Sequence, residues 1–132
     1  MKLEHVAIYT KRLEVLREFY EKYFDAKPNE KYTSKKEPNV VFESYFLSFE
    51  SGARLELMTR TDVPQAENPN GVETAGLTHI ALSVGCADDL DRLFMRLKGD
   101  GVSVVSEPRT TGDGYYEACV LDPDGNRIEI TG

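Results

Sequence analysis

The chain has 132 residues, a length typical of one domain or of two small modules packed together. Its net charge of −7 argues against a nucleic-acid ligand or an anionic membrane surface, because both require a basic protein surface. No apolar run approaches the roughly eighteen residues of a membrane-spanning helix, and the first residues lack the apolar segment of a signal peptide. We therefore expect a cytoplasmic protein.

In chain order, the first half predicts a strand, a helix and three further strands. Residues 3–10 are rich in branched and aromatic side chains, as strands are. Apolar residues at helical spacing then predict an amphipathic helix over about 11–24, with Thr10 as its N-cap. The strands expected after it lie near residues 29–33, 40–49 and 53–59.

The second half predicts the same order of elements. A strand over 77–85 precedes a helix over about 87–98, which Gly99 or Gly101 can end in a left-handed conformation. The strands expected after it lie near residues 102–106, 115–122 and 126–131. Asp-Pro-Asp-Gly at 122–125 predicts the turn between the last two. Residues 61–76 contain two prolines, two asparagines and no periodicity, which indicates a linker.

The two halves are copies of one unit. Leu3–Ile8 matches Leu77–Leu82 at an offset of 74 residues, and Gly52–Leu57 matches Gly125–Ile130 at an offset of 73. Two matches at nearly equal offsets indicate an internal repeat. The sequence therefore predicts an α+β fold of two tandem β-α-β-β-β modules, about 1–60 and 77–132.

Four residues at equivalent positions of the repeat suggest a metal site. The two histidines, His5 and His79, each lie in the first strand of a unit, and Glu56 and Glu129 each lie between apolar residues of a last strand. Taken singly, a strand histidine is usually structural and an alternating glutamate is usually solvated. Together, two imidazoles and two carboxylates suit nickel, cobalt, manganese, iron or zinc. The fourfold coincidence favours a divalent metal ion bound by all four.

The sequence resembles the vicinal oxygen chelate superfamily, which includes glyoxalase I, methylmalonyl-CoA epimerase, fosfomycin resistance enzymes and extradiol dioxygenases. The resemblance covers the whole chain: paired β-α-β-β-β units, first-strand histidines, the Asp-Pro-Asp-Gly turn and the closing Ile-Glu-Ile strand. It implies a single domain over 1–132 in which the two modules form a cup-shaped curled sheet around the metal. It also implies a homodimer, because a second copy often completes the cup of short chains.

The ligand set implies a subfamily. His5, Glu56, His79 and Glu129 fall on the four ligand positions of glyoxalase I. The epimerase has glutamine where Glu56 stands, and the fosfomycin enzymes and dioxygenases use two histidines and one glutamate. The resemblance therefore implies a glyoxalase I-like carbon–sulfur lyase, with nickel or cobalt favoured as the metal. Its reaction would be an enediolate-forming proton transfer on a hemithioacetal or related 2-hydroxycarbonyl compound, with Glu129 as the general base and Glu56 serving the opposite face.

Two positions depart from the glyoxalase I pattern. Tyr9 stands where that family has an arginine for glutathione, and Arg60 stands where it has an asparagine. We expect Tyr9 and Arg60 to bind another small-molecule substrate, with Arg60 on an anionic group. The alternatives are a solvated arginine at a strand end and an ordinary aromatic strand residue. Arg54 and Arg127 are expected to stabilise the neighbouring turns.

Other functions remain open on the same fold. The alternatives are an epimerase, a thiol transferase, a dioxygenase and a small-molecule or drug-binding resistance protein, although the intact quartet counts against the last. The two cysteines, Cys86 and Cys119, form no CxxC pair. We expect both to be small buried or half-buried thiols.

Overall fold

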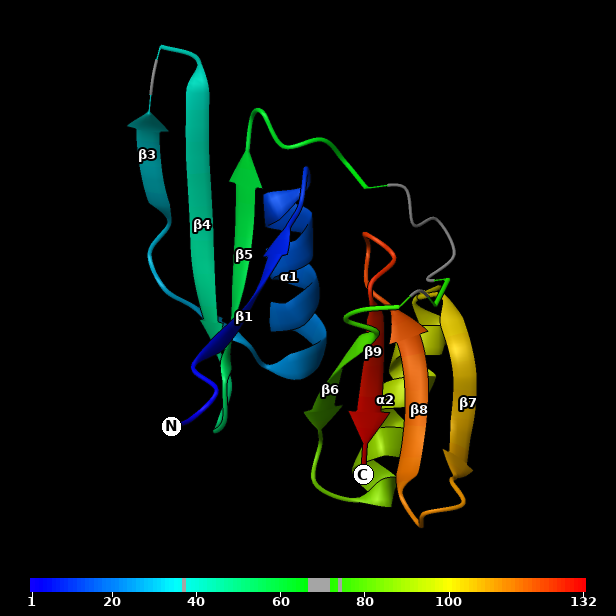
Figure 1. Cartoon of the computed structure of the whole chain (residues 1–132). Coiled ribbons are helices and arrows are strands. Elements are labelled where there is room, and N and C mark those ends of the chain that lie inside the picture. Colours follow the sequence, from blue (N-terminus) through cyan, green and yellow to red (C-terminus); the bar gives the residue numbers. More distant parts are fainter. Residues whose placement is uncertain (37, 67–71, 74) are drawn as a thin grey trace. The chain divides into compact units, whose positions relative to one another are not determined.

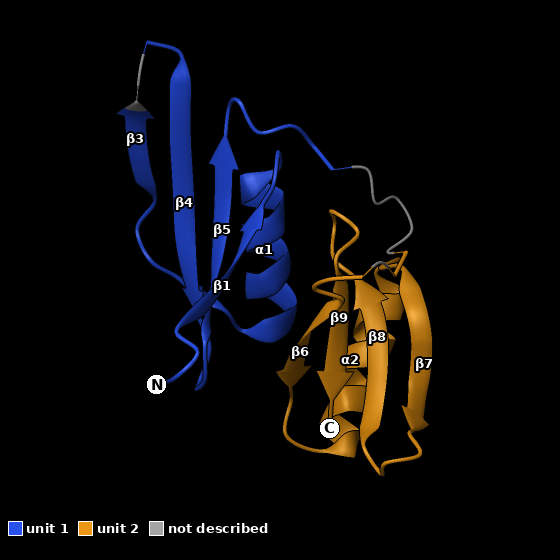
Figure 2. Ribbon diagram, in the orientation of Figure 1, with its two compact units in different colours: residues 1–67 blue, residues 68–132 orange. Residues whose placement is uncertain are grey.

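The structure is a computed structural model that describes residues 1–36, 38–66, 72–73 and 75–132. Figure 1 labels its helices and strands. Figure 2 colours its two compact units, residues 1–67 and 68–132. Each unit has its own sheet and its own helix, and each is described by itself.

The first unit places one helix on one face of a twisted sheet (Figure 1). Its strands run in the order β1-β5-β4-β2, with β3 also paired to β4. β1 and β5 are parallel, and the remaining pairs are antiparallel. The elements are β1 (His5–Tyr9), α1 (Leu13–Phe24), β2 (Lys27–Pro28), β3 (Tyr32–Lys36), β4 (Val40–Ser48) and β5 (Arg54–Arg60).

The second unit repeats this arrangement with four strands in the order β6-β9-β8-β7. Its elements are β6 (His79–Ser83), α2 (Ala87–Gly99), β7 (Val104–Thr110), β8 (Tyr116–Leu121) and β9 (Arg127–Thr131). Neither α1 nor α2, the helices of the described residues, has the length and apolar content that a membrane crossing requires.

Strand alternation decides which side chains enter each core. In the first unit, Leu55 and Leu57 of β5 are buried on the side of α1, whose Leu16 is fully buried. In the second unit, Ile128 and Ile130 of β9 are fully buried in the same way. Successive strand residues point to opposite faces. The residues between these apolar pairs therefore face away from the helices.

The strand registers confirm the repeat. In the first unit, His5 pairs with Arg54 and Ala7 pairs with Glu56. In the second, His79 pairs with Arg127 and Ala81 pairs with Glu129. The predicted α+β class and the duplicated β-α-β-β-β order are confirmed. The union of both units in one domain over 1–132, with 61–76 as the linker, stays a prediction.

The predicted N-cap of the first helix is wrong by two residues. The helix begins at Leu13 after Arg12, and Thr10 is instead buried at the end of β1. Its backbone N–H donates to Met58 O at 2.8 Å, and its side-chain oxygen accepts from Arg12 N at 2.8 Å. Because Thr10 still pairs with β5, the chain turns after it, and only then does the helix begin.

The structure agrees with the sequence prediction at two boundaries that contain a glycine. Gly101 has φ 82°, as predicted for the residue after the second helix, whereas Gly99 lies within α2. Gly125 has φ 83° and donates its N–H to Asp122 O at 3.0 Å. The carboxylate of Asp122 also accepts hydrogen bonds from Asp124 N and Asn126 N, each at 2.9 Å. The predicted Asp-Pro-Asp-Gly turn is confirmed.

The remaining boundaries shift by a few residues. The strand expected near 29–33 is divided into β2 and β3, and the strand expected near 102–106 is observed at Val104–Thr110. β7 contains register irregularities against β8. Edge-strand irregularities of this kind leave little trace in side-chain alternation, which explains why its end was not predictable.

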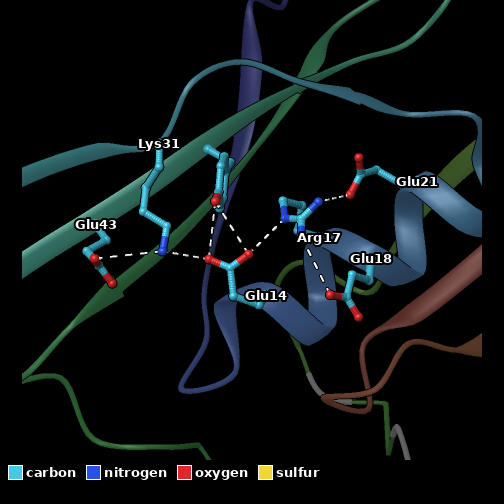
Figure 3. Close-up of polar contacts among 7 residues, drawn as sticks. Glu14, Arg17, Glu18, Glu21, Lys31 and Glu43 are labelled. Atoms are coloured by element: carbon cyan, nitrogen blue, oxygen red, sulfur yellow. Dashed lines mark hydrogen bonds and ion pairs between the residues drawn. The ribbon is translucent and has the colours of Figure 1, made fainter.

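An ionic network joins α1 to β4 and to the segment just before β3 in the first unit (Figure 3). Glu14 lies 2.6 Å from Lys31 Nζ, accepts a hydrogen bond from Arg17 Nε at 2.9 Å and accepts another from the Tyr45 hydroxyl at 3.1 Å. These donors, Lys31 first, hold the pKa of the Glu14 carboxyl below its ordinary value of 4.5. The charged form of Glu14 therefore stabilises the folded unit.

This network predicts a pH-dependent contribution to stability. Because the folded pKa of Glu14 is lowered, its contribution is present above about pH 4.5 and is lost as pH falls through the folded pKa. We expect Glu14→Gln to lower the free energy of unfolding at pH 7, and its difference from wild type to shrink towards pH 3. Urea denaturation across this range measures the effect.

Glu18→Gln on the same helix is the matched control. Glu18 lies 3.6 Å from Arg17, and 69% of its side chain is exposed. We expect its effect to be small at every pH, because exposed ion pairs contribute little. A difference between Glu14→Gln and wild type that stays constant from pH 7 to pH 3 would contradict the assignment.

Candidate metal centre

His5 and Glu56 lie side by side in the first unit. They come from the parallel strands β1 and β5, on the face turned away from α1. His5 Nε2 is 3.7 Å from Glu56 Oε2. The glutamate side chain is 14% exposed, and the histidine side chain is 39% exposed. This half-open pair combines an imidazole nitrogen and a carboxylate oxygen that a small cation can reach.

His79 and Glu129 form the same pair in the second unit. His79 Nε2 is 3.4 Å from Glu129 Oε2, and the Glu129 side chain is 22% exposed. The pair lies on β6 and β9 at the register of its counterpart on β1 and β5. The repeated geometry follows from repeated strand alternation, because Ile128 and Ile130 enter the core on either side of Glu129.

Each pair has the geometry expected of two ligands of one metal-binding site. Nitrogen and oxygen ligands bind a cation such as zinc at about 2.1 Å. If the ligand–metal–ligand angle lies between the octahedral and the tetrahedral value, the two ligand atoms are roughly 3.0–3.4 Å apart. The observed separations of 3.7 Å and 3.4 Å are close to this range and longer than a strong hydrogen bond. Within the described residues, no group of three or more His, Cys, Asp or Glu side chains forms a metal-binding cluster. A single site made of all four residues therefore stays a prediction.

His5 has an outer set of contacts that the sequence does not predict. The Glu4 carboxylate accepts a hydrogen bond from His5 Nδ1, and Arg54 donates Nε to the same carboxylate at 2.9 Å. These bonds, that from His5 first, hold the pKa of Glu4 below its ordinary value. Arg54 was expected to stabilise a turn, yet its guanidinium lies on Glu4 and 4.2 Å from the Phe46 ring centroid. The available signal was a glutamate directly before the first-strand histidine.

Tyr9 and Arg60, the predicted substrate-binding residues, lie near each other. Both belong to the face of Glu56, because each is separated from a member of the pair by an even number of strand residues. The Arg60 guanidinium lies 5.9 Å from the Tyr9 ring centroid. Arg60 Nε also donates to Asp62 Oδ1 at 2.6 Å, so its charge is already partly balanced.

Aromatic side chains occupy much of the same face. Phe46 is opposite Glu56 in the strand register, and Phe42 is opposite Arg60. Tyr32 is exposed, with its ring centroid 6.2 Å from that of Phe42. The surface beside His5 and Glu56 can therefore contact a planar or apolar part of a substrate.

The equivalent face of the second unit is more polar. Cys119 is opposite Glu129 in the register, and Glu117 is opposite Thr131. The Tyr116 hydroxyl donates to Asp91 on α2 at 2.8 Å, which places Tyr116 on the helix side.

A separate hollow lies on the other side of the first sheet. It has a volume of about 460 Å³ and lies at the beginning of α1. Its lining includes Thr59, which strand alternation places on the same side as Leu57 and opposite Glu56. Lys31, Glu14 and Glu43 of the ionic network also line it. This hollow is therefore distinct from the His5–Glu56 face.

The comparisons with known proteins define the class. Residues 2–130 match the Glyoxalase/Bleomycin resistance protein/Dioxygenase superfamily, and the chain belongs to this family. The predicted resemblance to vicinal oxygen chelate proteins is thereby confirmed. The superfamily includes glyoxalase I and dioxygenase enzymes, and its members generally use divalent metals.

One relative similar in sequence is an oxygenase. Biphenyl-2,3-diol 1,2-dioxygenase 2 of Rhodococcus globerulus is 30% identical over 135 residues. The match covers 98% of this chain and 61% of that enzyme, so the chain spans less than two thirds of its relative's length.

Several solved structures share the fold. Glyoxalase I of Zea mays has a TM-score of 0.76 at 22% identity, covering 98% of this chain and 44% of its own. The trypanothione-dependent glyoxalase I of Leishmania major has a TM-score of 0.75 at 23% identity, covering 100% and 86%. A glyoxylase/bleomycin resistance protein/dioxygenase domain from Frankia sp. EAN1pec has a TM-score of 0.73 at 19% identity, covering 99% and 96%. At these identities the likeness establishes the fold alone.

The environments of the two cysteines predict different reactivities. Cys119 is buried as expected, and burial raises the pKa of its thiol. Cys86 is exposed, contrary to expectation, because it lies at the N-cap of α2 outside the core. The thiolate is the reactive species. We expect an aromatic disulfide reagent to modify Cys86 rapidly in native protein and Cys119 only after unfolding.

Cys86→Ser is the control for this assignment. The variant should lose the rapid phase and keep the phase that appears in denaturant. Rapid modification of native Cys86→Ser would contradict the burial of Cys119.

Proposed function

We propose that the protein is a divalent-metal-dependent lyase or isomerase of the glyoxalase I type. In this proposal His5, Glu56, His79 and Glu129 bind one cation, with nickel or cobalt favoured over zinc, manganese or iron. The observation that supports it is the repeated His–Glu pair, which has the same register in both units and separations of 3.7 Å and 3.4 Å. Two carboxylates also balance the charge of a divalent ion.

The reaction is proton transfer next to a carbonyl group, which forms an enediolate. A bound cation supplies electrostatic stabilisation of negative charge on the substrate oxygens. Glu129 is the general base in this proposal, and Glu56 serves the opposite face of the substrate. The side chain of Glu129 is 22% exposed against 14% for Glu56, so the proposed base is the more accessible of the two.

The substrate is a hemithioacetal or a related 2-hydroxycarbonyl compound. Tyr9 and Arg60 stand where glyoxalase I has glutathione contacts, so their chemistry favours a different group at this position. An anionic substituent would compete with Asp62 for Arg60, and the ring of Tyr9 would pack beside it. The neighbouring Phe42 and Phe46 favour a substrate with an apolar part.

A dioxygenase is the second candidate, favoured by the Rhodococcus relative. Such an enzyme needs two histidines and one glutamate, and Glu56 would then be surplus. Epimerase and thiol transferase activities are further alternatives on the same metal site. A drug-binding resistance protein agrees less well with two preserved His–Glu pairs. The proposal includes a homodimer in the cytoplasm.

The proposal predicts metal in the purified protein. Chain prepared without a histidine tag and dialysed should retain near-stoichiometric nickel, cobalt, zinc, manganese or iron by elemental mass spectrometry. His5→Ala and His79→Ala should each lose most of it, because each removes an imidazole donor. Glu107→Gln is the control, since Glu107 is an exposed residue of β7 bound to Lys98. Metal-free protein that takes up none of these cations would contradict the proposal.

The two enzyme candidates predict different chemistry. A lyase or isomerase should exchange the carbonyl-adjacent proton of methylglyoxal–thiol hemithioacetals with solvent deuterium. Glu129→Gln should slow this by about 10²- to 10⁴-fold, the range for loss of a general base. Glu107→Gln should leave the rate unchanged.

The dioxygenase candidate gives the opposite pattern. Oxygen consumption with Fe(II) and a catechol, without proton exchange on any hemithioacetal, would replace the lyase by the dioxygenase. In that case Glu56→Gln should retain most of the activity, because the two-histidine, one-glutamate set would remain.

A further inference from the structure

The two histidines differ in their second ring nitrogen. His5 Nδ1 contacts the carboxylate of Glu4, the residue directly before it in the chain. The repeat offset of 74 residues places Thr78 at the corresponding position before His79. Threonine has no carboxylate, so His79 has no equivalent of the Glu4 contact. The repeat therefore preserves the His–Glu pair but not this outer contact.

The contact determines where the ring proton of His5 lies. A carboxylate only accepts hydrogen bonds, so Nδ1 must carry the hydrogen that joins it to Glu4. In the neutral ring, the other nitrogen then has an exposed lone pair. That nitrogen, Nε2, is the one 3.7 Å from Glu56 Oε2. Glu4 therefore selects the tautomer that offers Nε2 beside Glu56.

Further contacts fix Glu4 in place. Arg54 donates hydrogen bonds from Nε and Nη2 to Glu4 Oε1 at 2.9 Å and 2.5 Å, while Glu4 Oε2 accepts the hydrogen bond from His5 Nδ1. One carboxylate oxygen is thus used for the arginine and the other for the histidine. The backbone N–H of Arg54 also donates to Glu4 O at 2.9 Å, which ties the start of β1 to β5.

Phe46 constrains both partners of Glu4. The His5 ring meets Phe46 edge-on, with ring centroids 5.3 Å apart and planes at 88°. The Arg54 guanidinium lies 4.2 Å from the same ring centroid. Phe46 itself is held opposite Glu56 by the β4–β5 register. The imidazole is therefore oriented by packing as well as by its hydrogen bond.

We propose that Glu4 is a positioning residue for His5, which holds the imidazole in the Nδ1–H tautomer so that Nε2 and Glu56 are preorganised to bind a cation. The role toward the cation rests on the proposed metal-dependent function, whereas the tautomer is a property of the metal-free protein. Outer carboxylates of this kind orient metal-binding histidines and raise their basicity. The first unit is accordingly the preorganised half of the quartet.

The tautomer is tested directly by nitrogen NMR of the metal-free protein. The spectra are recorded at about pH 8.5, above the ordinary imidazole pKa of ~6.5, and the shift of each ring nitrogen reports whether it carries a proton. In wild type, His5 should be protonated on Nδ1. Glu4→Ala should shift His5 towards the Nε2–H form. Glu4→Gln should lie between them, because its amide oxygen still accepts a hydrogen bond.

His79 is the internal control in the same spectra. Its ring signals should be unchanged by either substitution at Glu4, because His79 lies in the other unit. Identical tautomer populations of His5 in wild type and Glu4→Ala would overturn the proposal. So would a wild-type His5 that carries its proton on Nε2.

Nickel affinity tests the consequence for the cation. In competition with a chromophoric chelator, Glu4→Ala should bind Ni²⁺ about 10- to 100-fold more weakly than wild type. Glu73→Ala is the matched control, since Glu73 lies 3.8 Å from Arg127, the second unit's counterpart of Arg54, and should leave the affinity unchanged. Equal affinities of Glu4→Ala and wild type would overturn the role toward the cation. Failure of wild type to bind nickel or any other divalent ion would instead contradict the proposed function, and the tautomer measurement would still decide the role of Glu4.

Discussion

Side chains alternate between the two faces of their sheets along β5 and β9, so the apolar residues of each strand point to one side and its glutamate to the other. Leu55 and Leu57 are buried against α1, and Ile128 and Ile130 are buried on the helix side of the second sheet. A glutamate between two such residues has to face the opposite side. A shift of either strand by one residue would bury a carboxylate in an apolar core, which is strongly unfavourable. Burial of the core and presentation of the candidate ligands are therefore set by the same strand register.

The repeat has diverged around a preserved pair. Both units keep a histidine and a glutamate at the same register. Around His5 and Glu56 lie Phe46, Arg54 and Glu4, whereas Glu129 has a buried thiol, Cys119, opposite it. The pair is therefore common to both units, whereas the residues around it differ.

The sequence predicts the fold well where patterns are strong. The duplicated order, both helices and the Asp-Pro-Asp-Gly turn all follow from periodicity and turn chemistry. The start of α1 is missed because Thr10 pairs with Met58, a contact far away in the sequence. The division between β2 and β3 is missed because such short edge elements leave no clear alternation.

The sequence also predicts part of the candidate site. The sequence predicts that Glu56 and Glu129 face away from the apolar core, but the His–Glu pairs within each unit depend on β1 lying beside β5 and β6 beside β9. The Glu4–Arg54 contact is not predictable in this way, because Glu4 lies just outside β1 and alternation says nothing about its direction. The partnership of Arg60 with Asp62 likewise depends on the loop after β5. Contacts made by residues beyond strand ends require the three-dimensional structure.

We propose that the two His–Glu pairs bind the same cation. X-ray absorption spectroscopy of nickel-loaded protein tests this most directly, because outer-shell scattering counts the imidazole rings bound to each metal. The account predicts two imidazoles per nickel, with a first shell of nitrogen and oxygen and no sulfur. One imidazole per nickel would show that each pair binds its own ion and would contradict the account.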